Sequence, residues 1–275
     1  METTHIKRFN YIDRGFHFFL ILTFLIQAIT GFSRLFFPTA WGKVITSFLG
    51  GYNSAFIMHK WAGGLMICGF IVHTLYLFSK IDGKKLKLSF FGPDSIIPNF
   101  KDLKIFKQMI LWFFGMGEKP QTGRWSYWEK FDYWAVYWGI PLLGITGLML
   151  IYPVFTSRYV PGWTLNIAAL FHKAEAILAV SYVFIVHFYV GHLRPQNFPM
   201  NEAMFAGTVS MEEVEDEKPE WIEQLRKEGN LEDAKTTPPS SGFRVLYTIF
   251  GYAAVLSGLY ILINGIINSN LIALH

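Results

Sequence analysis

Cysteine is nearly absent from this sequence: Cys68, inside an apolar run, is the only one. A single cysteine excludes an intrachain disulfide, a CxxCH segment for covalent attachment of a c-type heme, and a four-cysteine iron–sulfur site. Charge is also scarce, because only 16% of the residues are Asp, Glu, Lys or Arg, against about 25% in soluble domains. The chain has no glycine-rich phosphate loop and no long basic tract, so no nucleic acid partner is expected. A mean hydropathy of +0.31 completes the pattern of a membrane protein.

Apolar residues fall into five long runs. A transmembrane helix needs roughly 20 apolar residues, and the segments that meet this length are about 15–37, 54–79, 130–153, 167–191 and 243–268. We therefore predict an all-α membrane protein with five spans. The first four spans, within residues 1–200, would form one transmembrane domain. The charged stretch 201–242 would be a short helix and a cytoplasmic linker to the fifth span.

Basic residues are concentrated in two of the segments outside the spans. The loop 80–125 contains Lys80, Lys84, Lys85, Lys87, Lys101, Lys104, Lys107, Lys119 and Arg124, and the N-terminus contains Lys7, Arg8 and Arg14. Cytoplasmic loops carry the excess of Lys and Arg. We therefore expect the N-terminus and the loop 80–125 to be cytoplasmic.

The loop 80–125 also contains an amphipathic pattern. In "KDLKIFKQMILWFF", Ile105, Met109, Trp112 and Phe113 share one helical face, with lysines elsewhere. Such a helix is expected to lie on the membrane surface or to dock a partner.

Histidines recur in the second and fourth spans at nearly equal spacing. His59 and His73 are fourteen positions apart, and His172 and His187 are fifteen apart. These spacings correspond to roughly 21 and 22 Å along a helix and return to nearly the same face. Because the two spans run in the same direction, His59 is expected level with His172 near the outer surface, and His73 level with His187 near the cytoplasmic surface. His17, at the start of the first span, reaches the cytoplasmic level as well.

Histidines at two depths are what two stacked bis-histidine hemes require. Each iron needs two neutral imidazoles from opposite sides, and glycines on the facing helices make room for the macrocycle. Ionisable residues inside a membrane are expected to be functional, and a histidine relay in a proton-coupled transporter without heme is the alternative. A transporter more often shows broken helices or inverted repeats, and the sequence shows neither.

The sequence resembles the transmembrane di-heme cytochromes b, such as the gamma subunit of formate dehydrogenase and the cytochrome b subunits of hydrogenases and thiosulfate reductases. The segments that carry the resemblance are "RGFHFFLILTFLIQAITGF", "HKWAGGLMICGFIVH", "EKFDYWAVYWGIPLLGITGLML" and "FHKAEAILAVSYVFIVHFYVGHLRP". The resemblance implies a four-helix di-heme bundle followed by a fifth transmembrane helix. It also implies two heme b groups, a quinone (menaquinone or ubiquinone) as substrate, and a place in the cytoplasmic (inner) membrane of a prokaryote.

The resemblance implies His59 and His172 as the ligands of the outer heme, but its branches differ at the inner one. In the formate dehydrogenase pattern, His17 pairs with His187, and in the pattern of bc-type complexes, His73 does. The "RGFH" that opens the first span and the "TG" near its end favour His17, with His73 as the alternative.

The expected function is electron transfer across the membrane between a redox partner and quinone. The substrate chemistry would belong to a partner subunit, namely a multiheme cytochrome c, an iron–sulfur protein or a molybdenum enzyme. The candidates for quinone or proton contacts at the cytoplasmic ends of spans three and four are Glu129, Asp132, His192 and Arg194. On an α-helix, His192 would point roughly 140° away from His187.

Overall fold

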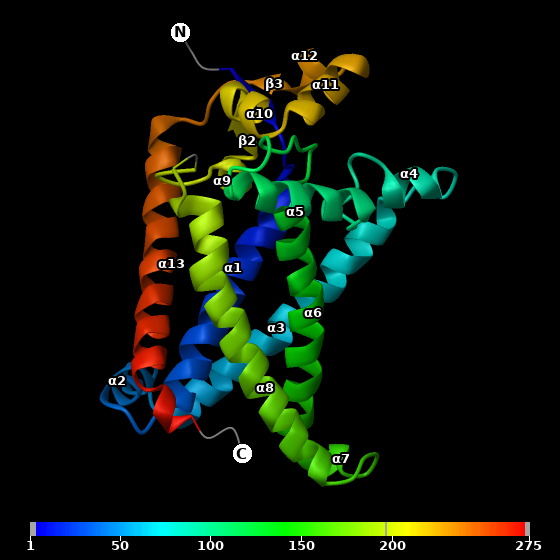
Figure 1. Ribbon diagram of the computed structural model, residues 1–275. Coiled ribbons are helices and arrows are strands. Elements are labelled where there is room, and N and C mark those ends of the chain that lie inside the picture. Colours follow the sequence, from blue (N-terminus) through cyan, green and yellow to red (C-terminus); the bar gives the residue numbers. More distant parts are fainter. Residues whose placement is uncertain (1–3, 196, 273–275) are drawn as a thin grey trace. The chain divides into compact units, whose positions relative to one another are not determined.

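A computed structural model describes residues 4–195 and 197–272 (Figure 1). Five helical segments of the described residues are long and apolar enough to cross a membrane: Tyr11–Leu35 (α1), Tyr52–Ser79 (α3), Tyr127–Ile151 (α6), Trp163–Leu193 and Ser241–Ile267 (α13). Each lies within a few residues of a predicted span. The all-α membrane fold is thereby confirmed.

The span Trp163–Leu193 is not one uniform α-helix. It consists of an α-helix, Trp163–Ser181 (α8), followed by two π-helical segments, Tyr182–His187 (η1) and Tyr189–Leu193 (η2). A π-helix bonds residue i to residue i+5; it is rare, and it occurs frequently at functional sites. The helix therefore changes its pitch just where the inner histidines lie.

Short helices lie between the spans. Among them are Ala40–Phe48 (α2), Leu86–Phe91 (α4), Phe100–Phe113 (α5) and Pro153–Thr156 (α7), and Ser269–Leu271 (η3) follows the last span. The chain divides into two compact units: residues 1–14, 75–136 and 202–244 form unit 1, and residues 15–74, 137–201 and 245–275 form unit 2. The membrane-spanning bundle belongs mainly to unit 2.

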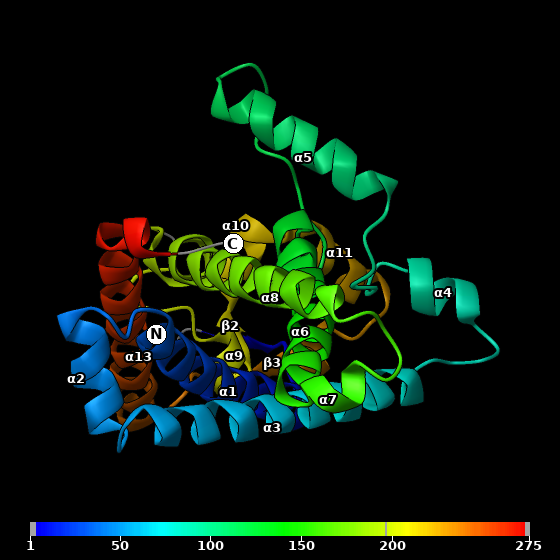
Figure 2. The same cartoon turned by 90° about the horizontal axis from the view of Figure 1, so that it is seen from below.

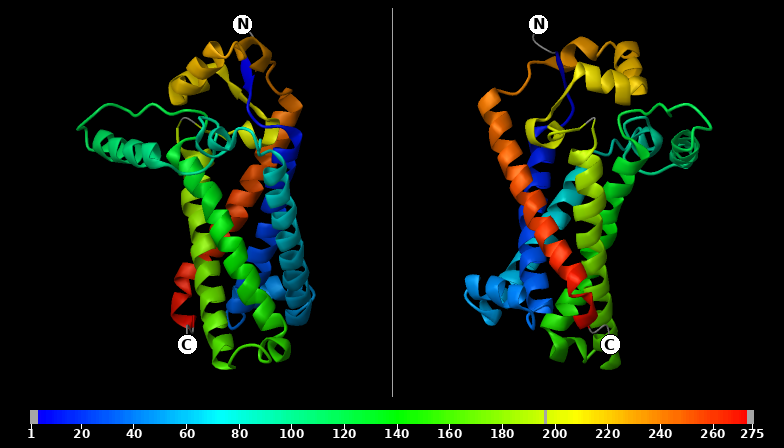
Figure 3. Two further views of the ribbon diagram at one scale, coloured as in Figure 1. Left: turned by 90° about the vertical axis from the view of Figure 1, so that its right-hand side faces the viewer. Right: turned by 60° about the vertical axis from the view of Figure 1, so that its left-hand side comes forward.

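In unit 2, α13 packs along α1 and the fourth span (Figure 3). Their buried cluster is Ala28, Phe32, Phe36, Trp41, Val180, Phe184, Phe188, Val255, Ile261 and Leu262. Gly258 permits this approach, because a Cβ there would overlap the Phe184 ring. The fifth span is therefore an integral part of the apolar packing.

In unit 1, the N-terminal segment pairs with the stretch predicted to be a linker. His5–Lys7 (β1) lies between Thr208–Ser210 (β2) and Lys235–Thr236 (β3) in an antiparallel sheet of order β2-β1-β3. The same stretch forms the helices Ala203–Ala206 (α9), Met211–Glu217 (α10), Pro219–Lys227 (α11) and Leu231–Ala234 (α12). A small apolar core around Ile6, Val209 and Trp221 lies among them. Residues 5–7 and 203–236 thus form a folded region, which we call the cap, where the sequence predicted one short helix and a linker.

Glu129, in the first turn of α6, ties this cap together. Its carboxylate accepts from Arg8 Nη2 at 2.9 Å, from Lys218 Nζ at 2.8 Å and from the Ser126 amide at 2.9 Å. Burial lowers the pKa of the Lys218 ammonium, and the Glu129 carboxylate opposes that shift. A buried carboxylate held by two cations is strongly destabilising to remove, because the cations are then left unpaired.

The helix α5 confirms the amphipathic segment in the loop but not its exposed face. Asn99 and Asp102 form a capping box at its N-terminus, which satisfies two backbone amides. Ile105 is only 6% exposed, whereas Trp112 and Phe113 of the same predicted face are 43% and 77% exposed, so only the N-terminal part of that face turns toward the protein. Figure 2 shows α4 and α5 as two helices joined by an irregular segment.

Candidate heme-ligating histidine pairs

His59 of α3 and His172 of α8 face one another in unit 2. Their ring centroids are 6.2 Å apart, and the ring planes are inclined at 76°. The two histidines predicted to share the outer level are thus neighbours in space.

Each of these two imidazoles is held by a threonine hydroxyl from the preceding span. His59 Nδ1 lies 3.0 Å from Thr30 Oγ1, and His172 Nδ1 lies 3.0 Å from Thr146 Oγ1. The hydroxyl protons are already donated to backbone oxygens, that of Thr30 to Ile26 at 2.6 Å and that of Thr146 to Leu142 at 2.7 Å. A hydroxyl has a single proton to donate, so in each pair it accepts the N–H of Nδ1. Both imidazoles are thereby fixed in the tautomer that leaves the Nε2 lone pair for a metal.

A glycine beside each threonine gives the imidazole its space. A Cβ added to Gly31 would lie 3.1 Å from His59 Cε1, and one added to Gly147 would lie 3.2 Å from His172 Cε1. Both distances are shorter than ordinary van der Waals contact. The sequence Ile-Thr-Gly, residues 29–31 and 145–147, therefore forms one wall of the site on each side.

The second histidine pair lies further along the bundle. The ring centroids of His17 in α1 and His187 in η1 are 6.5 Å apart, with an interplanar angle of 45°. His73, the alternative partner, packs edge-on against the Phe16 ring at 4.7 Å. The structure thus brings the ring of His17, one of the two open candidates, next to that of His187.

His192 lies beside His187, which corrects the angle expected from α-helical geometry. The two ring centroids are 6.1 Å apart. Because the segment is π-helical, residue i+5 returns to the side of residue i. The inner region of unit 2 therefore brings together three imidazoles, those of His17, His187 and His192.

The two facing pairs, His59 with His172 and His17 with His187, match the dimensions of axial heme ligation. A bond between imidazole and a first-row metal is about 2.0 Å long, and the ring centre lies about 1.2 Å beyond the nitrogen. Two imidazoles on opposite sides of one iron then have centroids roughly 6.4 Å apart. The observed 6.2 and 6.5 Å are close to this value, and neutral nitrogen donors suit b-type heme iron. The residues present therefore fit the cofactor.

The remaining candidates for quinone or proton contacts belong to two different units of the chain. Glu129 is engaged with Arg8 and Lys218, and Asp132 follows it in α6 of unit 1. Arg194 ends η2 in unit 2 in an extended conformation, two residues after His192. His192 is in ring contact with His187, at 6.1 Å between the ring centroids.

Three residues near the outer pair were missed from the sequence. Thr30 and Thr146 orient the imidazoles, and Gln27 Nε2 donates to the His59 carbonyl oxygen at 2.7 Å. The signal for the threonines was the repeated Ile-Thr-Gly, once in the span before each outer histidine.

Three cationic residues lie on the helices that form the His59–His172 site, namely Arg34 on α1, Lys60 on α3 and Lys173 on α8. The Arg34 guanidinium lies over the rings of Tyr52 and Phe56, at 4.8 and 4.7 Å from their centroids. Lys60 and Lys173 directly follow the two outer histidines. These three side chains are the groups that would neutralise heme propionates there.

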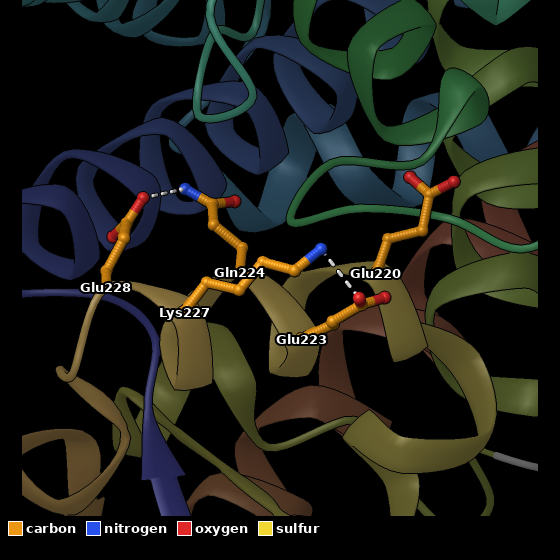
Figure 4. Close-up of a pocket in the computed structure, with 5 residues that line it drawn as sticks. All are labelled: Glu220, Glu223, Gln224, Lys227 and Glu228. Carbon is orange, nitrogen blue, oxygen red and sulfur yellow. Dashed lines mark hydrogen bonds and ion pairs between the residues drawn. The ribbon is translucent and has the colours of Figure 1, made fainter.

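A polar surface on α11 is a further place where ionisable side chains gather (Figure 4). Lys227 pairs with Glu223 at 2.6 Å, and Gln224 donates to Glu228 at 2.9 Å. The hydrogen bond from Lys227 lowers the pKa of Glu223. These contacts are those of a solvated helix face.

The fold and the paired histidines define a class, the helical membrane cytochromes. The family model described as prokaryotic cytochrome b561 matches residues 8–205. The chain therefore belongs to the prokaryotic cytochrome b561 family, which confirms the resemblance seen in the sequence.

Curated relatives agree with this assignment. The chain is 23% identical over 223 residues to the cytochrome b556 subunit of the nitrate-inducible formate dehydrogenase of Escherichia coli K12. The match covers 81% of this chain and 92% of that subunit. The corresponding subunits of Escherichia coli O157:H7 and Shigella flexneri match to the same extent. The chain is thus a membrane cytochrome b of a respiratory oxidoreductase, and heme b is the cofactor of its family.

Proposed function

We propose that this chain is a di-heme subunit that passes electrons across the membrane between a redox partner and the quinone pool. The observation that carries the proposal is the presence of two facing histidine pairs, each with a centroid separation suited to one iron. Along the fourth span, His172 and His187 are fifteen residues apart, which corresponds to roughly 22 Å of helix. Each heme supplies an iron that accepts and releases one electron.

Within this proposal, His59 and His172 ligate the outer heme, and His17 and His187 ligate the inner heme. The centroid separation of 6.5 Å supports His17. His73 then supports the inner site through its packing against Phe16, the residue adjacent to His17.

The quinone site is proposed at the inner end of unit 2, with His192 and Arg194 as its polar residues. Quinone reduction takes up protons and quinol oxidation releases them, so an ionisable group near the inner heme is needed. The proximity of His192 to His187 supports its place there. The ion pairs of Glu129 favour a structural role for that residue.

The proposed orientation places the N-terminus and unit 1 in the cytoplasm. The distribution of Lys and Arg supports it, since the loop 80–125 contains nine basic residues and short basic loops stay cytoplasmic. The His59–His172 site then lies toward the outer surface.

The partner is proposed to be an enzyme subunit that carries the substrate chemistry. The formate dehydrogenase relatives support an iron–sulfur or molybdenum subunit, and a multiheme cytochrome c would serve the same purpose. It would deliver electrons to, or receive them from, the outer heme.

The test is a reduced-minus-oxidised visible spectrum of the purified chain, with heme counted per polypeptide. We expect a b-type α band and two hemes in the unaltered protein. His59→Ala and His17→Ala should each remove one heme, while His73→Ala should retain both. A protein without a b-type band contradicts the proposal and favours the transporter alternative. Loss of a heme in His73→Ala but not in His17→Ala reverses the inner assignment.

A further inference from the structure

The helix α5 exposes a row of four apolar side chains. Leu103, Phe106, Ile110 and Phe113 are 63%, 47%, 43% and 77% exposed. Their spacing of three, four and three residues places them on one helical face. We call this row the α5 stripe. A continuous exposed apolar face of this kind marks a surface that contacts lipid or protein.

The N-terminus of α5 is held at the level where α6 begins. Lys130, in the first turn of α6, donates to Asp102 at 3.0 Å, and both side chains are buried. The Phe106 ring lies 5.4 Å from that of Tyr127, the first residue of α6. The sequence at this point, Trp125-Ser126-Tyr127-Trp128, has the aromatic residues that mark a membrane–water interface.

Lysines line the side of α5 next to the stripe. Lys104 and Lys107 are exposed, whereas the neighbouring Lys101 pairs with Glu220 at 2.6 Å. Basic residues at this level are attracted to anionic lipid headgroups. Their charge complements a phospholipid surface.

We propose that α5 lies in the bilayer interface, with the α5 stripe among the acyl chains and Lys104 and Lys107 on anionic phospholipid headgroups. The tether to a transmembrane helix keeps α5 at the interface, so the nearest apolar phase is the bilayer itself. The proposal stands whether or not the heme and quinone assignments hold.

The test uses the full heme-loaded chain, because unit 1 includes the first turns of α6. In a Cys68→Ser background, spin labels are attached at Phe106→Cys, Phe113→Cys or Leu103→Cys on the stripe. Matched labels go at Lys104→Cys and Gln108→Cys on the other side. The protein is reconstituted in nanodiscs of phosphatidylethanolamine and phosphatidylglycerol. Relaxation of each label by oxygen and by a water-soluble nickel chelate is then measured.

We expect the stripe labels to be relaxed several-fold more by oxygen than by nickel, and the Lys104 and Gln108 labels to show the reverse. Replacing phosphatidylglycerol by phosphatidylcholine should make the stripe labels shallower. Stripe labels that meet the nickel chelate as freely as the Lys104 label overturn the proposal, because α5 is then in water. Immobile stripe labels that neither reagent reaches also overturn it, because a second copy or another protein then covers the stripe. Three stripe positions keep the test intact if one variant loses its heme.

Discussion

Removing the threonine hydroxyls should raise the midpoint potential of the outer heme alone. In Thr30→Val and Thr146→Val, a methyl group replaces the hydroxyl at nearly constant volume. Each variant loses the 3.0 Å hydrogen bond to Nδ1 of its histidine. Such a bond raises the basicity of a ligating imidazole. Its loss therefore weakens the stabilisation of the ferric state more than that of the ferrous state.

The magnitude follows from the strength of the bond. A net hydrogen bond contributes about 0.5–1.5 kcal/mol, and a tenfold change in a one-electron equilibrium is about 59 mV. The full bond thus corresponds to about 20–60 mV, which bounds the rise expected from each substitution. Because the two hydroxyls act on opposite sides of one iron, the double variant should shift by about the sum.

The assay is a potentiometric titration followed at the α bands of the two hemes. Thr30→Ser and Thr146→Ser retain the hydroxyl and should stay near the unaltered potential. Thr23→Val is a matched control, since that buried hydroxyl on α1 bonds to the Phe19 carbonyl oxygen at 2.9 Å. An unchanged outer potential in both valine variants refutes the tautomer argument. An equal shift in the midpoint potentials of both hemes, or a shift of the potential in Thr23→Val, refutes the claim that the threonine effect is restricted to the outer heme.

Two other substitutions test the site and the cap. Gly31→Val should displace the His59 imidazole, because a Cβ at position 31 would already lie 3.1 Å from His59 Cε1. Heme counting should then show one heme per chain. Gly64→Ala is the control, because a Cβ added at Gly64 meets no atom within 4 Å. Glu129→Gln should destabilise the protein by about 3–5 kcal/mol, because two buried cations lose their counter-charge. Thermal unfolding should report that loss while the heme content of the folded protein stays unchanged. An unaltered unfolding temperature would show that the ion pairs contribute nothing.

The spans and the partners of the outer histidines were predictable from sequence. Continuous apolar runs report membrane helices directly, because lipid admits few other structures. The sequence left the choice between His17 and His73 open, because both are expected at the same level, and the proposal of His17 rests on its ring distance to His187.

The position of His192 and the folded cap were not predictable. The angle predicted between His187 and His192 assumed the 100° per residue of an α-helix, and no residue pattern in "YVFIVHFYVGHL" indicates a π-helix. The strands of the cap are two or three residues long, too short to show an alternating pattern. Their pairing depends on contacts such as Ile6 with Val209, about 200 residues apart in the sequence. The sequence also could not predict which face of α5 is exposed, because that depends on which face packs against the rest of the protein.

The outer site is divisible into two equivalent halves. One hairpin, α1 with α3, contributes an Ile-Thr-Gly and a histidine, and a second hairpin, α6 with α8, contributes the same set. Gly31 and His59 are separated by 28 positions, and Gly147 and His172 by 25. Two identical copies of one such hairpin would supply both axial imidazoles and both hydroxyls that fix the tautomer. They would also supply the two glycines that leave space for the imidazole rings. The arrangement is that of a duplicated half-site, and a homodimer of a single two-helix peptide is the smallest assembly that could reproduce it.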